Sequence, residues 1–245
     1  VDDLIAEIGK SLPVPGAAII GEPTSLLPVN GHKSASRYIT RLKGRSAHSS
    51  NPAAGINAIY TAQKVIQKLQ EIFKEIKNDA ALNPVPQAQL FDPPYSTLSL
   101  GTIHGGSAIN VVPETCEIGW EARTLPWEGP HKYMNQVKEF CEALSTSQAQ
   151  SQKTIFSHEI ESFLPGLTPK ENSIAYNYYR AMMDSDGRTP VPPTTVSFGT
   201  EAGKYEKAGI PSLVGGPGSI AQAHKPDEYI EKQQIIDCCN LLSSL

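Results

Sequence analysis

The stretch CEIGWEAR at residues 116–123 alternates between apolar and charged side chains. Its even-numbered members are apolar, and its odd-numbered members are charged except for Gly119. A period of two indicates a strand with one face against a core and the other face in solvent. Residues 34–43 show a similar alternation, in which Tyr38, Thr40 and Leu42 share one face. The sequence therefore predicts two half-exposed strands, which are typical of an antiparallel sheet.

Helical patterns and two further strands surround this pair. Apolar residues recur at steps of three and four after Asn57, and a second helical pattern runs from about Pro130 to Leu144. Prolines mark residues 83–94 as a loop, a strand precedes residue 116, and another lies near residues 154–160. Strand, helix, strand, strand, helix, strand is the order of the ferredoxin-like arrangement, an antiparallel sheet with two helices on one face. The apolar stripe of the first helix comprises Ile59, Ala62, Ile66, Leu69, Phe73 and Ile76.

The flanking residues have α/β character. A short apolar run at residues 17–20 ends in turn residues, which favours a strand buried in a parallel sheet. We therefore expect a parallel α/β domain in two parts, residues 1–31 and 166–245, interrupted by a ferredoxin-like insert at residues 32–165. Downstream of the insert we expect helices at 173–183, 201–208 and 231–245, and strands at 195–198 and 212–214.

The composition excludes several classes of protein. With 245 residues, 39% apolar and 19% charged, the chain is expected to form one or two globular domains rather than a disordered, collagenous or coiled-coil protein. A net charge of −4 offers no basic excess for binding nucleic acid. No apolar run approaches the roughly 18 residues of a membrane span. Four cysteines without a CxxC pair favour free thiols in a reducing compartment, so we expect a cytoplasmic protein.

Three glycine-containing loops follow predicted strands, at residues 21–24, 199–202 and 215–218. Ligands bind beyond the carboxyl ends of strands in open parallel sheets. These loops and the residues after them supply carboxylates and His224, which is the ligand chemistry of a catalytic zinc site. The spacing alone leaves two readings open, because Glu22 could also be a surface or capping residue and His224 an ordinary hydrogen-bonding residue.

Eight motifs in order along the chain resemble one family. The motifs are AIIGEPTSL (18–26), GRSAHSS (44–50), GINAI (55–59), NVVP (110–113), ARTLP (122–126), GTEA (199–202), GPGSI (216–220) and QAHKPDEY (222–229). With these motifs, the sequence is similar to the acetylornithine deacetylase / succinyl-diaminopimelate desuccinylase family of di-zinc amidohydrolases and exopeptidases. The resemblance runs over nearly the whole chain, which excludes a chance match.

The resemblance implies metal and catalytic roles for three residues. Glu22 would be the carboxylate ligand of one zinc ion and His224 the imidazole ligand of the other, with cobalt as a possible alternative metal. His48 would reach into the active site of the partner subunit and stabilise the oxyanion, which implies a homodimer formed through the insert. The remaining alternative for His48 is an ordinary loop histidine.

The resemblance also implies substrate-binding roles for Asn110, Arg123 and Gly218. Arg123 would capture an α-carboxylate with both prongs of its guanidinium, and the glycine loop would line the pocket with backbone. A solvated Arg123 and a turn role for Asn110 stay open. Glu121 departs from the pattern, because the family usually has Asp two residues before this arginine.

Several implied groups have no counterpart in this chain. No histidine precedes Gly21, and the only acidic residues there are Asp2, Asp3 and Glu7. The resemblance implies that the bridging Asp, the general-base Glu and further ligands lie upstream of Val1. A hydrolytic zinc needs three protein ligands. We therefore expect these 245 residues to bind little or no zinc and to be inactive alone.

The function implied by the resemblance is metal-dependent hydrolysis of a small-molecule N-acyl amino acid. The GEPTSL and QAHKPDEY segments favour N-acetyl-L-ornithine as substrate, with L-ornithine and acetate as products, a step of arginine biosynthesis. The alternatives are desuccinylase, aminoacylase or carboxypeptidase activity. An alternative of another class is a non-catalytic chain that only dimerises through the insert.

Overall fold

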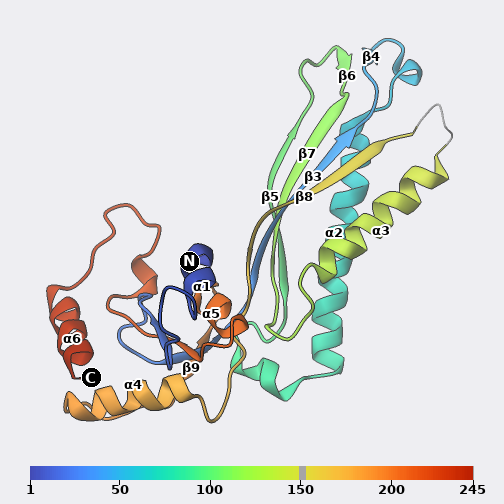
Figure 1. The fold of residues 1–245 in the computed structure, drawn as a ribbon. Coiled ribbons are helices and arrows are strands. Elements are labelled where there is room, and N and C mark those ends of the chain that lie inside the picture. Colours follow the sequence, from blue (N-terminus) through green and yellow to red (C-terminus); the bar gives the residue numbers. More distant parts are fainter. Residues whose placement is uncertain (149–152, 245) are drawn as a thin grey trace.

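A four-stranded antiparallel sheet forms the spine of the inserted region. The computed structural model describes residues 1–148 and 153–244. In Figure 1 the sheet extends away from the part of the molecule that holds both termini. All three strand pairings are antiparallel, and the strand order is β5-β7-β3-β8. The strands are β3 (Ala35–Lys43), β5 (Thr97–Gly105), β7 (Thr115–Arg123) and β8 (Ile155–Leu164).

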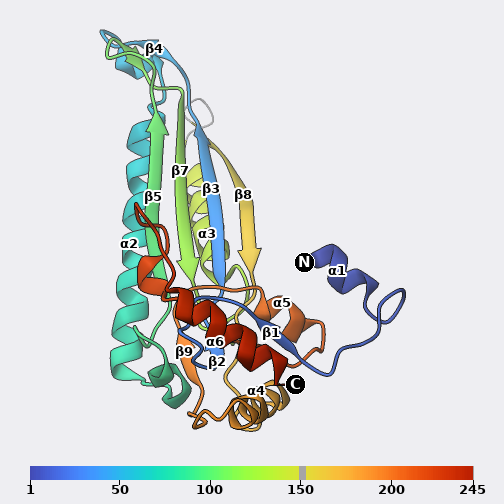
Figure 2. The ribbon, with the colours of Figure 1, turned by 90° about the vertical axis from the view of Figure 1, so that its left-hand side faces the viewer.

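Two helices cover one face of this sheet, α2 (Ala58–Leu82) and α3 (Lys132–Ser147), as Figure 1 and Figure 2 show. Asn57 begins α2 as predicted, since its side-chain oxygen accepts hydrogen bonds from two backbone N–H groups of the first turn. The element order confirms the ferredoxin-like arrangement expected from the sequence. The core between sheet and helices includes Tyr38, Leu42, Ala62, Val65, Leu69, Ile72, Ile118, Trp120, Met134, Val137 and Cys141.

The buried stripe of α2 differs from the predicted stripe near the start of the helix. Ile59 is 37% exposed, whereas Ala58, Ala62 and Val65 are fully buried. The two alanines face the sheet, where a small side chain suits the close approach of helix and strands. The prediction was therefore wrong at Ile59 and omitted Ala58 and Val65, but it was correct at Ala62 and Leu69.

The far end of the insert is a tip built from two short strands. β4 (Ala47–His48) pairs with β6 (Val111–Val112), and a 3-10 turn at Pro52–Ala54 follows β4. Gly44 is required here, because a Cβ at this position would lie 2.1 Å from the carbonyl oxygen of Ile56. The loop predicted at 83–94 contains a 3-10 turn at Pro86–Leu90 and lies at the opposite end of α2.

The second region contains a short four-stranded sheet in the order β1-β10-β2-β9. β1 pairs with β10 in parallel, which agrees with the parallel α/β domain expected from the sequence. β2 and β9 are also parallel, but the β10–β2 pair is antiparallel, so the sheet is mixed. The sequence did not predict β2, because Asn30 and Gly31 interrupt its pattern. The strands are β1 (Ala18–Ile20), β2 (Val29–His32), β9 (Thr194–Val196) and β10 (Ser212–Val214).

The predicted helices of this region are present. They are α4 (Ile174–Ser185), α5 (Ala202–Lys207) and α6 (Lys232–Ser243). The region also contains α1 (Asp2–Glu7) and the 3-10 turn Ile220–Gln222. The predicted end of the last helix at Leu245 lies outside the described residues. No helix in the described part of the chain is long and apolar enough to cross a membrane.

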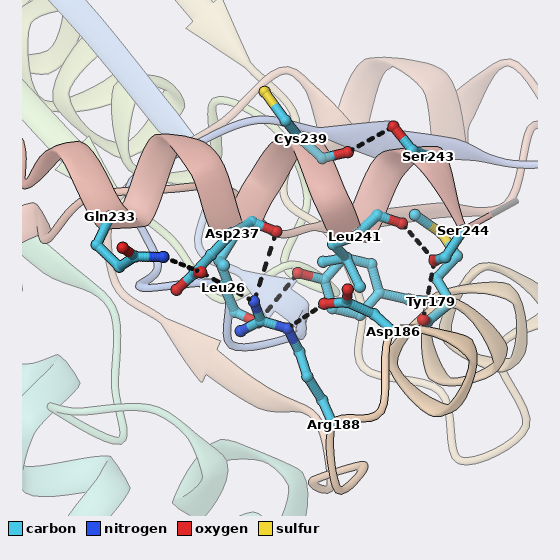
Figure 3. Close-up of polar contacts among 11 residues, drawn as sticks. Leu26, Tyr179, Asp186, Arg188, Gln233, Asp237, Cys239, Leu241, Ser243 and Ser244 are labelled. Carbon is cyan, nitrogen blue, oxygen red and sulfur yellow. Dashed lines mark hydrogen bonds and ion pairs between the residues drawn. The ribbon is translucent and has the colours of Figure 1, made fainter.

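Polar contacts hold α6 onto the segment after α4, as Figure 3 shows. Arg188 Nε lies 2.5 Å from Asp186 Oδ2, and its Nη2 lies 3.6 Å from Asp237 Oδ1 on α6. The Tyr179 hydroxyl donates to the carbonyl oxygen of Leu26 at 3.0 Å. The loop after β1, α4 and α6 are therefore tied together.

The two regions meet where the chain crosses from β2 to β3 and returns after β8. His32 and Leu167 exchange both backbone hydrogen bonds, each 3.0 Å long, across this junction. Lys33 is fully buried, and its Nζ donates to the carbonyl oxygens of Pro93 and Tyr95 at 2.7 Å each. Burial lowers the pKa of Lys33 to about 8. This ammonium therefore fastens the junction to the proline-rich loop of the insert.

Candidate active site

Glu22 lies in the loop that follows β1. Its backbone N–H donates to Ile20 O at 3.0 Å, which turns the chain sharply after the strand. A Cβ on Gly216 would lie 2.6 Å from Glu22 O, so the two loops can pack this closely only with glycine at 216. Burial raises the pKa of the Glu22 carboxyl, and the negative charge of Glu201 raises it further. The carboxylate after β1 thus interacts electrostatically with the carboxylate at the start of α5.

Glu201 is the N-cap residue of α5 and lies in the second of the three glycine-containing loops, GTEA at residues 199–202. The adjacent Thr200 is buried, and its Oγ1 accepts a hydrogen bond from Ala202 N at 3.1 Å. The sequence marked this loop as a source of carboxylates but assigned Glu201 no role. Its proximity to Glu22 depends on how α5 packs against β1 and β10, which no local pattern encodes.

Gly218 and His224 occupy the loop after β10. Gly218 has a φ of 86°, its N–H donates to Gln234 Oε1 at 3.3 Å, and its carbonyl oxygen accepts from Ser25 N at 2.7 Å. Its backbone polar groups thus have partners within the chain. His224 is exposed, with its backbone N–H 3.1 Å from Glu228 Oε2.

The predicted metal ligands do not form a metal-binding set by themselves. Within residues 1–148 and 153–244, no group of three or more His, Cys, Asp or Glu side chains is placed to hold a metal ion. A catalytic zinc site takes three protein ligands. The described residues therefore do not fit a complete zinc centre, and Glu22 and Glu201 offer only the start of a cation site.

Arg123 ends β7 at the base of the insert and faces the second region. A Cβ on Gly199 would lie 3.5 Å from Arg123 Nη1, so the guanidinium lies against the loop that leads to Glu201. The side chain is 29% exposed and forms an ion pair with Glu121, with Arg123 Nε 2.7 Å from Glu121 Oε1. The fold thus brings the predicted carboxylate-binding residue of the insert to a loop of the other region.

His48 and Asn110 lie together at the tip. The carbonyl oxygen of Asn110 accepts from Ser49 N at 3.0 Å, and His48 Nδ1 lies 2.8 Å from Ser50 Oγ. Both residues are exposed. β7 runs from the tip to Arg123 in eight residue steps of about 3.4 Å, so about 27 Å of strand separate the two groups. The structure therefore divides the predicted site residues between the tip and the base of the insert.

Comparison with known proteins matches the insert to a separate domain. Residues 30–148 match the peptidase dimerisation domain of the M20 type. An acetylornithine deacetylase of Klebsiella pneumoniae is 35% identical over 236 residues, which cover 94% of this chain and 56% of the relative. An acetylornithine deacetylase of Buchnera aphidicola is 33% identical over 231 residues, with the same two coverages. The chain is related to the acetylornithine deacetylases and carries a peptidase dimerisation domain.

Solved structures show the same fold. An M20 family metallo-carboxypeptidase of Sulfolobus solfataricus has a TM-score of 0.69 at 15% identity, covering 99% of this chain and 65% of its own. A tripeptidase of Staphylococcus aureus has a TM-score of 0.66 at 20% identity, covering 98% and 58%. The chain spans about 56% of the length of the curated deacetylases that it matches. The solved structures thus share the fold of the chain.

Proposed function

We propose that this chain is part of a metal-dependent amidohydrolase that converts N-acetyl-L-ornithine to L-ornithine and acetate. One observation carries the proposal. Arg123, the predicted ligand of the substrate α-carboxylate, lies against the Gly199 loop, and that loop leads to the carboxylate pair Glu22 and Glu201. A cation bound at Glu22 and an arginine against the Gly199 loop would suit a substrate with a polar carbonyl near a carboxylate. Sequence relation to acetylornithine deacetylases over 94% of the chain supports the choice of substrate.

The metal of this proposal is zinc, with cobalt as the alternative, and further ligands would come from outside the described residues. Glu22 and His224 are the ligands that we propose within this chain. One solved relative, the YxeP protein of Bacillus subtilis, is described as a dinuclear metal-binding M20 peptidase, which supports a two-metal site here. We expect the 245 residues alone to bind zinc weakly, because Glu22 and His224 would be single ligands of different ions and a catalytic zinc takes three protein ligands.

The proposed assembly is a homodimer in which the tip of one chain acts at the base of the other. About 27 Å of strand separate the tip from Arg123, so His48 and Asn110 of one chain lie far from that chain's own base site. At the partner's site, an exposed imidazole could stabilise the oxyanion of the tetrahedral intermediate, a role worth about 3–4 kcal/mol in comparable sites. The match to a peptidase dimerisation domain supports this assembly.

The decisive experiment compares the full-length gene product with the 245-residue chain, each supplied with Zn²⁺ or Co²⁺. We expect the full-length product to hydrolyse N-acetyl-L-ornithine and the 245-residue chain to bind less than one zinc and hydrolyse nothing. A preference for N-succinyl amino acids would instead indicate a desuccinylase. A preference for neutral N-acyl amino acids would indicate an aminoacylase, and a preference for peptides would indicate a carboxypeptidase. Tight binding of two zinc ions with turnover by the 245-residue chain would contradict the ligand assignment.

The shared site has its own test in the full-length gene product. We expect the His48→Ala and Glu22→Gln variants each to lose activity, because one removes the donated imidazole and the other a ligand. Mixed and allowed to exchange subunits, they should recover about a quarter of the parent activity, since half the dimers are mixed and each of these keeps one intact site. No recovery despite proven exchange would show that His48 acts within its own chain.

A second candidate is a non-catalytic chain that dimerises through the insert. The absence of a three-ligand set in the described residues favours it. A full-length product that forms a dimer, binds no metal and hydrolyses none of the N-acyl amino acids would establish this candidate and refute the first.

A further inference from the structure

The sheet face that no helix covers carries a row of charged residues on β3 and β7, which lie side by side (Figure 1). Arg37 on β3 is directly opposite Glu121 on β7, and Arg123 is two residues further along β7. Side chains two residues apart on a strand share a face. The three side chains therefore form one cluster, at the end of the sheet nearest the second region.

Glu121 binds the two guanidinium groups unequally. Its Oε1 lies 2.7 Å from Arg123 Nε, and its Oε2 lies 3.0 Å from Arg123 Nη2. The contact to Arg37 is a single one, with Arg37 Nε 3.5 Å from Glu121 Oε2. The Glu121–Arg123 pair is thus a two-pronged ion pair, the geometry in which a carboxylate fixes both the position and the plane of a guanidinium.

This pairing leaves one nitrogen of Arg123 directed across the junction. The Nε and Nη2 edge is occupied by Glu121, while Nη1 lies 3.5 Å from the Cβ position of Gly199. The side chain of Arg123 is 29% exposed, so part of it remains accessible to a ligand. An arginine in solvent would rotate among many rotamers, whereas this one is oriented by a neighbour on its own strand.

We propose that Glu121 is a positioning residue that holds Arg123 so that Nη1 faces the substrate carboxylate beside the Gly199 loop. The inference rests on the proposed function, in which Arg123 binds that carboxylate. It also changes the expected mode of binding. The carboxylate is held end-on by the Nη1 side of the guanidinium, and the fork formed by Nε and Nη2 binds Glu121 instead.

The first test is structural and uses the 245-residue chain. Hydrogen exchange of the Arg123 Nε–H, followed by NMR, reports whether Glu121 holds the guanidinium. We expect the Glu121→Gln variant to exchange this proton about tenfold faster, because a charged two-pronged acceptor becomes a neutral amide. Glu117→Gln is the matched control, the same change on the same strand and face at a carboxylate that pairs with Arg41 instead. Equal exchange rates of the Arg123 Nε–H in the parent and in Glu121→Gln would show that Glu121 does not hold the guanidinium.

The second test asks whether the clamp serves the substrate, by titrating N-acetyl-L-ornithine and its carboxamide into the same chain. The Arg123 Nε resonance should shift with the carboxylate but not with the carboxamide, and the apparent affinity should weaken about tenfold in Glu121→Gln. Glu121→Asp, which keeps the charge, should recover part of this loss. An unchanged affinity of Glu121→Gln for N-acetyl-L-ornithine would overturn the positioning role, even if the exchange experiment shows that Glu121 holds the Arg123 guanidinium.

Turnover by the full-length gene product separates this proposal from the proposed function. We expect Glu121→Gln to raise KM for N-acetyl-L-ornithine about tenfold and to leave kcat within about twofold, because ground-state and transition-state binding are lost together. If the variant instead lost its preference for N-acetyl-L-ornithine over N-acetyl-norvaline, which keeps the α-carboxylate but has no ammonium on its side chain, Glu121 would contact the substrate ammonium and the proposal would be wrong. Absence of hydrolysis by the parent would refute the proposed function, while the exchange and titration results would still decide the role of Glu121.

Discussion

The insert and the second region differ in how their strands are stabilised. The four insert strands are nine or ten residues long and pack against two long helices over one continuous core. The second region has strands of three or four residues and two smaller clusters of buried residues. Its last helix leaves Ile235, Ile236 and Leu242 about half exposed. The insert therefore has one large continuous core, while the loops bearing Glu22, Glu201 and His224 belong to a region with shorter strands and smaller buried clusters.

The largest difference is expected from one matched pair of truncations. Ile118 is fully buried at the centre of the insert core, so Ile118→Ala should lower the free energy of unfolding of the insert by about 2–5 kcal/mol. Ile236 on α6 is 52% exposed, and Ile236→Ala should change stability by less than about 0.5 kcal/mol. Hydrogen exchange of backbone amides, measured with urea unfolding, assigns each loss to its region.

Two outcomes would break the comparison. A cost for Ile236→Ala as large as that for Ile118→Ala would show that the exposed face of α6 is packed in solution. Equal loss of protection in both regions after Ile118→Ala would show that the insert and the second region unfold as one cooperative unit.

The second prediction concerns His32, where the two regions join. His32 is fully buried, and its Nδ1 lies 2.9 Å from the carbonyl oxygen of Lys33. A carbonyl can only accept, so Nδ1 carries the proton, and Nε2 has no hydrogen-bond partner among the described residues. Burial lowers the pKa of His32 from 6.5 to about 4. Between these values the unfolded chain binds a proton that the folded chain does not.

Stability should therefore fall as the pH falls from about 6.5 to about 4, by about 3 kcal/mol from this residue. His32→Gln keeps an N–H donor and does not titrate, so the variant should lack this part of the pH dependence. Urea unfolding of parent and variant at pH 7, 6, 5 and 4 measures the difference, in which the other titrating groups cancel. The same change at the exposed His104 should leave the dependence as in the parent. If the free energy of unfolding depends on pH in the same way in the parent and in His32→Gln, acid destabilises the junction through other groups.

The sequence predicts the strands and helices of the insert better than those of the second region, and the reason is physical. A half-exposed strand such as β7 shows its burial directly in a period of two, and Asn57 marks the start of α2 by local capping chemistry. β2 is buried along its whole length, yet it contains Asn30, Gly31 and His32, so its hydropathy does not reveal it. Its antiparallel pairing with β10 is a tertiary contact that no local pattern specifies.

The candidate site follows the same rule. The motifs identified Glu22, Arg123 and His48 as residues of interest, but not which of them lie together. The long strands of the insert place His48 far from Arg123, and packing of α5 brings Glu201 near Glu22. Glu121 entered only as a departure from the Asp expected at its position, and its contact with Arg123 became visible with side-chain geometry.

The smallest effect is expected where α6 is fastened to the base. Arg188 pairs with Asp186 and Asp237 (Figure 3), and its side chain is 31% exposed, so water and salt screen these pairs. Arg188→Gln should weaken the attachment of α6 by about 0.5–1 kcal/mol and speed hydrogen exchange of its amides about two- to fivefold. Arg180→Gln, at an exposed position of α4, is the control and should leave α6 unchanged. Among the described residues, no hydrogen bond or ion pair joins Arg188, Asp186 or Asp237 to the insert, so the protection of the insert should stay constant in both variants. Equal protection of α6 in the two variants would show that apolar packing around Tyr179 and Leu241, rather than the ion pairs, holds the last helix on the base.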